Sequence, residues 1–208
     1  MIEIVDSKFL TSAPNVSLAP ESQENNEVVF MARSNVGKSS LLNALTNHKG
    51  LAKVSSTPGK TRLINYFDVT FLDRETLNKY QAKFVDLPGF GYAKVAKSIK
   101  HDWEKNLTDY IATREQIKIF IHLIDCRHPY LDIDTSVSQF LFDNIKENQY
   151  IIQIFTKIDK LNQKEQSALR REFPDAMTVS SSKKRGTQKI IKVIYDILQN
   201  SENKDNEN

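Results

Sequence analysis

The chain has 208 residues, with 29 Lys or Arg against 26 Asp or Glu, so its net charge is only +3. This length fits one compact domain with at most short extensions. Charged residues make up 26% and hydrophobic residues 39% of the chain, which excludes a fully disordered protein, a collagen and a low-complexity array. The single cysteine, Cys126, excludes an intrachain disulfide framework and a multi-cysteine zinc site.

Neither end of the chain carries a targeting pattern. Residues 1–11 hold Glu3, Asp6 and Lys8 among apolar residues, unlike a secretory signal. The most apolar stretch, 117–124, contains a lysine and a histidine and is far shorter than the ~20 residues of a membrane span. We therefore expect a cytoplasmic protein that does not enter a membrane. Separately, we expect it to act as a monomer.

The predicted elements alternate along the chain. Apolar runs rich in β-branched residues predict strands at 27–32, 65–72, 80–85, 117–124, 151–155 and 176–179. Apolar residues three and four apart predict helices at 38–47, 99–113, 134–147, 162–173 and 186–198. Residues 27–200 form the predicted domain, 1–26 an N-terminal extension or loop packed on it, and 201–208 a disordered tail.

This alternation predicts an α/β fold with a mainly parallel, six-stranded sheet and helices on both faces. The strands at 65–72 and 80–85 are joined too tightly for a crossover connection. They should therefore pair antiparallel and supply one antiparallel edge strand of the sheet.

The strongest motif is A-R-S-N-V-G-K-S at residues 32–39. It matches the P-loop pattern G-x-x-x-x-G-K-[ST] except for Ala32. A strand before it and a helix after it are the required context, because backbone N–H groups and the helix N-terminus then surround a phosphate. Lys38 would reach the β- and γ-phosphates, and Ser39 would offer its hydroxyl to Mg²⁺. The alternative, a chance match in an Asn/Ser loop, is disfavoured by the flanking elements.

A second motif, D-L-P-G at residues 86–89, directly follows a predicted strand. Asp86 can hold Mg²⁺ through water, and Gly89 can donate its N–H to the γ-phosphate and move when that phosphate leaves. Alone, this string is a common turn. Its place at a strand end downstream of the P-loop favours the nucleotide interpretation.

A third motif, T-K-I-D at residues 156–159, indicates the base. The Asp159 carboxylate can accept from both the imino and the exocyclic N–H of guanine, a pair of donors that adenine lacks. The stem of Lys157 would pack on the base plane, and Thr156 stands where most guanine-binding proteins carry Asn. The alternative is a solvated turn. Residues 179–181 add a weaker signal, because a backbone N–H there can contact the guanine keto oxygen.

A switch threonine must fold over Mg²⁺ in the triphosphate state. Thr57 and Thr61 both qualify by their position between the P-loop helix and the next strand.

These motifs, in this order, resemble the EngB family of bacterial GTPases, also called YihA or YsxC, within the TrmE-Era-EngA-EngB-Septin-like class. The resemblance covers about Glu27 to Leu198 and rests on R-S-N-V-G-K-S-S-L-L-N, S-T-P-G-K-T, D-L-P-G-F-G-Y-A, T-K-I-D and S-S-K-K. It implies a P-loop GTPase fold and hydrolysis of GTP to GDP and phosphate. It also implies a role in assembling the large ribosomal subunit, with rRNA and ribosomal proteins as partners, and a requirement in cell division and septation.

The resemblance also implies the site residues. Mg²⁺ would lie at Ser39 and Thr61, which favours Thr61 over Thr57, and Lys38, Thr61 and Gly89 would act on the transferring phosphoryl group. The implied nucleotide-binding residues are Ala32, Arg33, Ser34, Asn35, Val36, Gly37, Lys38, Ser39, Gly59, Lys60, Thr61, Arg62, Leu63, Asp86, Leu87, Pro88, Gly89, Thr156, Lys157, Ile158, Asp159, Val179, Ser180 and Ser181. The departures from the family pattern are Ala32 for Gly and Phe90 for Tyr.

Phe90 follows Gly89 where many signalling GTPases place a glutamine that orients water. An apolar ring makes no hydrogen bond to water, so we expect slow intrinsic hydrolysis. In related GTPases an Asn at the position of Asn35 helps hold a potassium ion that replaces an arginine finger. Here Asn35 either holds K⁺ or only tightens the loop.

Three basic clusters are expected on the rim that faces the nucleotide. They are Lys53, Lys60 and Arg62; Lys94, Lys97, Lys100 and Lys105; and Lys183, Lys184 and Arg185. They are either ordinary solvated residues or a phosphate-backbone footprint for ribosomal RNA.

Two other functions stay open: a P-loop ATPase or small-molecule kinase, and a non-catalytic GTP-dependent scaffold at the division site. His122 and Cys126 share a strand face, but two ligands make no zinc site.

Overall fold

The computed structural model describes residues 1–21, 26–53, 63–90, 105 and 107–205, the last five by their backbone alone. One sheet of seven strands runs through it in the order β1-β3-β4-β2-β5-β6-β7. The strands are β1 (Ile2–Ala13), β2 (Glu27–Ala32), β3 (Ile64–Asp73), β4 (Lys79–Asp86), β5 (Ile117–Asp125), β6 (Tyr150–Thr156) and β7 (Met177–Thr178). Strands β4, β2, β5, β6 and β7 are parallel neighbours.

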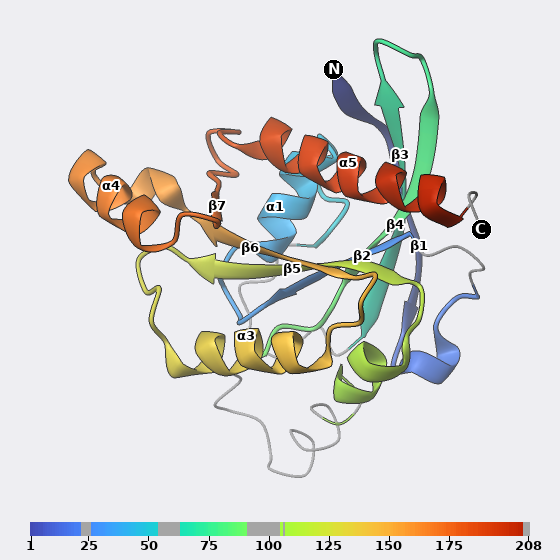
Figure 1. The fold of residues 1–208 in the computed structure, drawn as a ribbon, viewed down its shortest axis with the longest axis horizontal. Coiled ribbons are helices and arrows are strands. Elements are labelled where there is room, and N and C mark those ends of the chain that lie inside the picture. The colour runs from blue at the N-terminus through green and yellow to red at the C-terminus, as the bar shows by residue number, and fades with distance from the viewer. Residues whose placement is uncertain (22–25, 54–62, 91–104, 106, 206–208) are drawn as a thin grey trace.

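Helices cover both faces of the sheet (Figure 1). They are α1 (Lys38–Leu45), α3 (Asp132–Asn144), α4 (Gln163–Glu172) and α5 (Thr187–Asp205), with short 3-10 turns η1 (Val16–Leu18) and η2 (Ile158–Lys160). Residues 107–113 are also helical, which agrees with the end of the helix predicted at 99–113. The rest of that helix, 99–104 and 106, lies outside the described residues.

The core lies on both sides of β2 and β5, the two strands that are buried along their whole length. Alternate residues of a strand point to opposite faces. Val28 and Phe30 accordingly pack in the cluster that holds the apolar residues of α1 and α5. Val29 and Met31 pack in the cluster of α3 and residues 107–113. Burial on both faces therefore explains why these strands are mostly apolar, as the sequence indicated.

The sheet has seven strands rather than the predicted six, because residues 2–13 form an edge strand instead of belonging to a loop. Strand β1 pairs antiparallel with β3 from Ile2↔Asp73 to Ala13↔Ile64. Its register shifts between Ile4 and Asp6 and again between Phe9 and Thr11. Each shift adds a residue and breaks the two-residue alternation by which a strand is recognised. As predicted, β3 and β4 are antiparallel, but the edge beyond them belongs to β1.

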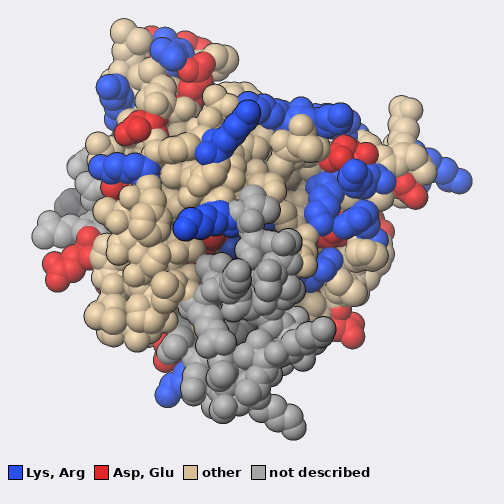
Figure 2. Space-filling model, turned by 180° about the vertical axis from the view of Figure 1, so that it is seen from behind, with Lys and Arg blue, Asp and Glu red and all other residues tan. Residues whose placement is uncertain are grey.

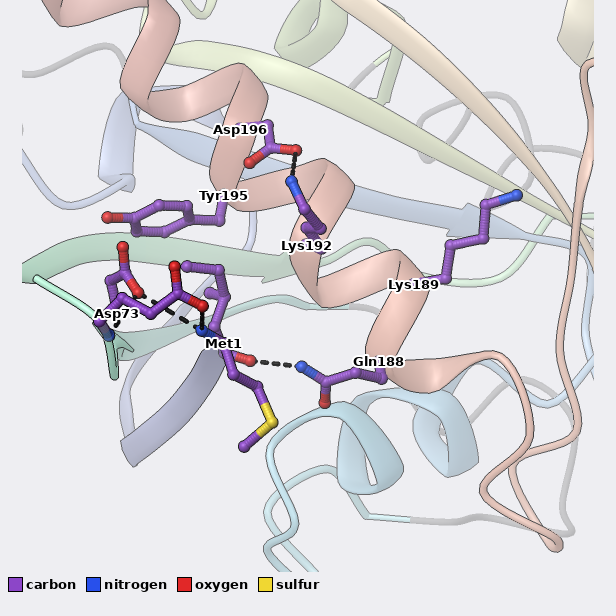
Figure 3. A pocket seen from close by; sticks show the side chains of 9 residues that line it. Met1, Asp73, Gln188, Lys189, Lys192, Tyr195 and Asp196 are labelled. Carbon is purple, nitrogen blue, oxygen red and sulfur yellow. Dashed lines mark hydrogen bonds and ion pairs between the residues drawn. The ribbon is translucent and has the colours of Figure 1, made fainter.

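Helix α5 continues to Asp205, beyond its predicted end at Leu198 and into the segment expected to be a tail. It closes over the sheet edge near the N-terminus (Figure 3). The Gln188 amide donates to the carbonyl oxygen of Ile2, and the Met1 ammonium donates to Glu75 at 2.8 Å. A pocket of about 530 Å³ lies between α5, the N-terminus and the β3–β4 turn, and no residue predicted to bind nucleotide lines it. Across the described ranges, no helix is long and apolar enough to cross a bilayer.

Candidate functional site

Four of the predicted motifs lie in the part of the chain that the structure describes. They come at the ends of β2, β4, β6 and β7. These strands are parallel, so their carboxyl ends lie at one edge, the usual place for a ligand in an open α/β sheet. In Figure 1 the arrow of β5 points to this edge, where β7 and α4 lie. The sheet thus brings together segments that are far apart in the sequence.

The P-loop turns sharply between β2 and α1. Asn35 has φ 65° and Gly37 has φ 108°, and α1 begins at the next residue, Lys38. A Cβ on Gly37 would have its nearest neighbour, Lys157 Cε, 3.9 Å away. The requirement for glycine here is therefore conformational: the left-handed backbone at Gly37 directs the chain into the helix. Val36 is fully buried and anchors the loop to the core.

Lys38 and Asp86 form an ion pair, with side chains only 12% and 7% exposed. The pair joins the P-loop motif to the D-L-P-G motif at the N-terminus of α1. The donor set at this point, the Ser39 hydroxyl next to Lys38 and a carboxylate at the end of β4, is of the oxygen type that Mg²⁺ prefers beside phosphates. The described residues therefore fit a magnesium ion.

The segment after Asp86 runs along β2 and the P-loop. Leu87 N–H donates to the carbonyl oxygen of Phe30 at 3.2 Å, and Phe90 N–H donates to that of Ala32 at 3.1 Å. Ser34 N–H in turn donates to the carbonyl oxygen of Phe90 at 3.3 Å. The Phe90 ring is buried in the core and lies 6.1 Å from the His122 ring, centroid to centroid. Its place in the core agrees with the view that it cannot orient water.

The T-K-I-D segment contacts the P-loop directly. Thr156 Oγ1 donates to the carbonyl oxygen of Val36 at 2.8 Å, and Lys157 Nζ donates to that of Asn35 at 2.7 Å. A hydrogen bond with Ser180, more than any other contact, lowers the pKa of Asp159. The carboxylate predicted to read the base therefore stays ionised at neutral pH and lies beside the loop after β7.

Three sets of comparisons bear on the family. Residues 27–157 match the family model described as "50S ribosome-binding GTPase". "Probable GTP-binding protein EngB" of Aliarcobacter butzleri is 56% identical over 184 residues, 88% of this chain and 92% of that protein. Its namesake in Wolinella succinogenes is 45% identical over 199 residues, 95% of this chain and 98% of that protein. This chain belongs to the EngB family of GTPases. It is thus a GTP-binding and GTP-hydrolysing protein.

Solved structures show the same fold. The crystal structure of a probable GTP-binding protein EngB matches with a TM-score of 0.62 and 20% identity, over 84% of this chain and 99% of that chain. Era in complex with MgGDPNP and a segment of 16S ribosomal RNA matches with a TM-score of 0.63 and 22% identity, over 83% of this chain and 56% of that chain. The P-loop GTPase fold predicted from the motifs is confirmed.

The motif analysis of this EngB-family chain missed Asp125, the last residue of β5. Burial favours the neutral form, but hydrogen bonds from Arg127 and Lys157 hold the pKa of Asp125 well below its usual range. The available signal was an acidic residue at the end of a mostly apolar strand, between the strands that carry the P-loop and the T-K-I-D motif. That signal names no partner, because only the sheet register places Asp125 opposite Thr156.

A second missed cluster lies behind the P-loop. Arg33 Nε donates to Asp134 Oδ2 at 3.2 Å, and His122 Nε2 lies 4.0 Å from Asp134 Oδ1. Arg33 was predicted to bind nucleotide through its place in the P-loop, but its side chain points to α3. His122, which received no role, is thus part of the packing beneath the site.

Some predicted site residues cannot be compared with the structure. Gly59, Lys60, Thr61 and Arg62 lie outside the described residues, as does Thr57. Of the basic clusters, Lys94, Lys97 and Lys100 lie outside them too. Leu63 is described and is exposed, one residue before β3 begins.

Proposed function

We propose that this EngB-family GTPase is a switch that assists assembly of the large ribosomal subunit in the cytoplasm and is required for normal cell division and septation. The observation that carries the proposal is the contact among the loops after β2, β4, β6 and β7 at one edge of the sheet. In particular, the P-loop touches both the carboxylate of the D-L-P-G motif and the T-K-I-D loop. A nucleotide bound there would be sensed by several loops at once.

In this proposal Asp159 reads guanine, and residues 32–39 bind the phosphates. Lys38 would leave Asp86 for the β- and γ-phosphates when nucleotide binds, and Gly89 N–H would contact the γ-phosphate. Ser39 and Thr61 would hold Mg²⁺, which supplies positive charge for the transferring phosphoryl group. Lys38 adds its own charge at the same place, so the protein stabilises the transition state mainly by electrostatics.

The proposed ribosomal partner is supported by the family description, "50S ribosome-binding GTPase". It is also supported by exposed basic residues that follow the base loop, namely Lys183, Lys184 and Arg185. Figure 2 shows Lys and Arg side chains gathered along the upper and right parts of one face. Such a surface suits the phosphate backbone of RNA.

Co-sedimentation with large-subunit particles, in a non-hydrolysable GTP analogue or in GDP, tests this function. We expect binding with the analogue and little with GDP. Lys183→Gln should weaken binding to these particles and reduce the salt dependence of that binding. Lys79→Gln should change neither, because Lys79 lies at the end of β4 away from the site. Equal co-sedimentation in both nucleotide states would contradict the switch. Nucleotide binding without turnover would favour the scaffold at the division site.

A further inference from the structure

A single ammonium group links three parts of the site. Lys157 Nζ donates to the carbonyl oxygen of Asn35 at 2.7 Å and to Asp125 Oδ2 at 2.9 Å. Asn35 belongs to the P-loop, Lys157 to the T-K-I-D loop, and Asp125 ends β5, the strand between β2 and β6. Lys157 therefore connects two loops that must contact the same nucleotide in the proposed site.

The Asp125 carboxylate is itself held firmly. Its Oδ1 accepts from Arg127 Nε at 2.9 Å and from the Arg127 backbone N–H at 3.1 Å. Its Oδ2 accepts from Arg127 Nη2 at 2.7 Å, and the Asp125 side chain is 3% exposed. A guanidinium that binds both carboxylate oxygens fixes the plane of the carboxylate. Because all of β5 is buried, its backbone is fixed as well.

The contacts from residues 156 and 157 also orient the P-loop backbone. The carbonyl oxygens of Asn35 and Val36 both face the T-K-I-D loop, where they accept from Lys157 and Thr156. A trans peptide points its N–H away from its carbonyl oxygen, and no described peptide bond is cis. The N–H of Val36 accordingly points across the loop, to the carbonyl oxygen of Arg33 at 3.4 Å. The T-K-I-D loop thus fixes the orientation of two consecutive peptide groups of the P-loop.

We propose that Asp125 is a positioning residue of the nucleotide site, which holds the Lys157 ammonium against the Asn35 carbonyl and so couples the base loop to the P-loop. The inference rests on the proposed function, because it takes these two loops to be the binding site. With the carboxylate present, the two loops are ordered before the nucleotide arrives. Without it, part of the binding energy must be spent on ordering them.

The test is Asp125→Asn, with GDP and IDP affinities measured by titration calorimetry. Asn has nearly the same volume, but its amide NH₂ must face either the Lys157 ammonium or the Arg127 guanidinium. We expect a loss of about tenfold in affinity, the scale of one charge-assisted hydrogen bond. IDP lacks the exocyclic amine that Asp159 would read, so the GDP-to-IDP ratio should stay unchanged. The matched control, Asp6→Asn, changes an exposed aspartate on β1 and should leave both affinities unchanged.

A double-mutant cycle separates positioning from a general structural role. In a Lys157→Met background, Asp125→Asn should lower nucleotide affinity by less than twofold, because the ammonium that Asp125 holds in place is already absent. A tenfold loss in both backgrounds, or an Asp125→Asn affinity equal to that of Asp6→Asn, would overturn the proposal.

If the Asp125→Asn variant does not fold, the Arg127→Gln variant is tested in its place. Arg127 is half exposed, and its loss should loosen the carboxylate and cost about threefold in affinity, again only when Lys157 is present. The same loss without Lys157, or no loss with it, would contradict the proposal. A wild-type chain that binds neither nucleotide would contradict the proposed function itself, a result seen before any variant is made.

Discussion

His122 and Asp134 are buried polar residues that face each other between β5 and α3, each 1% exposed. His122 Nδ1 shares a hydrogen bond of 3.0 Å with Ser138 Oγ, while its Nε2 and Asp134 Oδ1 are buried without a hydrogen-bond partner among the described residues. Burial lowers the pKa of His122 to about 4 and raises the pKa of Asp134, against the opposing charge of Arg33. The folded protein therefore keeps His122 neutral well below neutral pH.

This makes stability depend on pH in a predictable direction. Between about pH 6.5 and 4 the unfolded chain binds a proton at His122 and the folded protein does not, so the free energy of unfolding falls as the pH falls. From pH 6.5 to 5 the loss attributable to His122 should be about 2 kcal/mol. Urea unfolding of wild type and His122→Asn at several pH values measures this loss as the difference between the pH dependences of the two proteins. Parallel curves for the two proteins would show that His122 does not titrate as described.

Asn35 gives a second prediction at this scale. If its side chain holds a monovalent cation, K⁺ should accelerate GTP hydrolysis more than Na⁺ at equal ionic strength, because a site fits one ion's coordination distance. Asn35→Ala should abolish the difference and leave GDP affinity nearly intact, because the cation acts on charge that develops in the transition state. Equal rates in the two salts would leave Asn35 as a residue that only shapes the loop.

Among the elements, β2 and β5 could be predicted because burial on both faces favours a mostly apolar run, which both strands have. Strand β1 could not, because its two register shifts interrupt the alternation that marks a half-buried strand. The motif residues could also be named from the sequence, since each predicted nucleotide contact corresponds to a short local string. Asp125 could not, because its role depends on a partner from the next strand of the sheet rather than on its neighbours in the sequence.

The turn between β7 and α5 offers a matched test of backbone geometry. Gly186 has φ 86°, and a Cβ there would lie 2.4 Å from the carbonyl oxygen of Thr178. Gly50 has nearly the same φ, 83°, but a Cβ there would meet nothing within 4 Å. The Gly50→Ala substitution should therefore lower the free energy of unfolding by only about 1–2 kcal/mol, the cost of placing alanine in the left-handed region.

The Gly186→Ala substitution should lower the free energy of unfolding by at least about 1 kcal/mol more than Gly50→Ala does, because the turn must also move away from Thr178. It should weaken nucleotide binding too, since Ser180 exchanges two backbone hydrogen bonds with Arg185 across this turn. Thermal unfolding and GDP titration of both variants check this. Equal stability of the two would mean that the close approach at Gly186 is absent.

On the scale of the whole molecule, the parallel sheet is what turns separate motifs into one site. Thr156 and Val36 are 120 residues apart in sequence yet share a hydrogen bond of 2.8 Å. The order of strands, with β5 between β2 and β6, is what places their loops side by side. The central claim is therefore that these loops together bind one guanine nucleotide.

The most direct test of that claim is the base preference of Asp159→Asn. The substitution replaces a carboxylate that accepts two hydrogen bonds by an amide with one acceptor, so guanine loses a buried polar contact of about 2–4 kcal/mol. Xanthine presents a carbonyl oxygen where guanine has its amine, and the new NH₂ can donate to it. Affinities for GDP and XDP should be measured in wild type and variant. We predict a strong preference for GDP in wild type and a reversed preference in Asp159→Asn; unchanged GDP affinity in the variant would contradict the account.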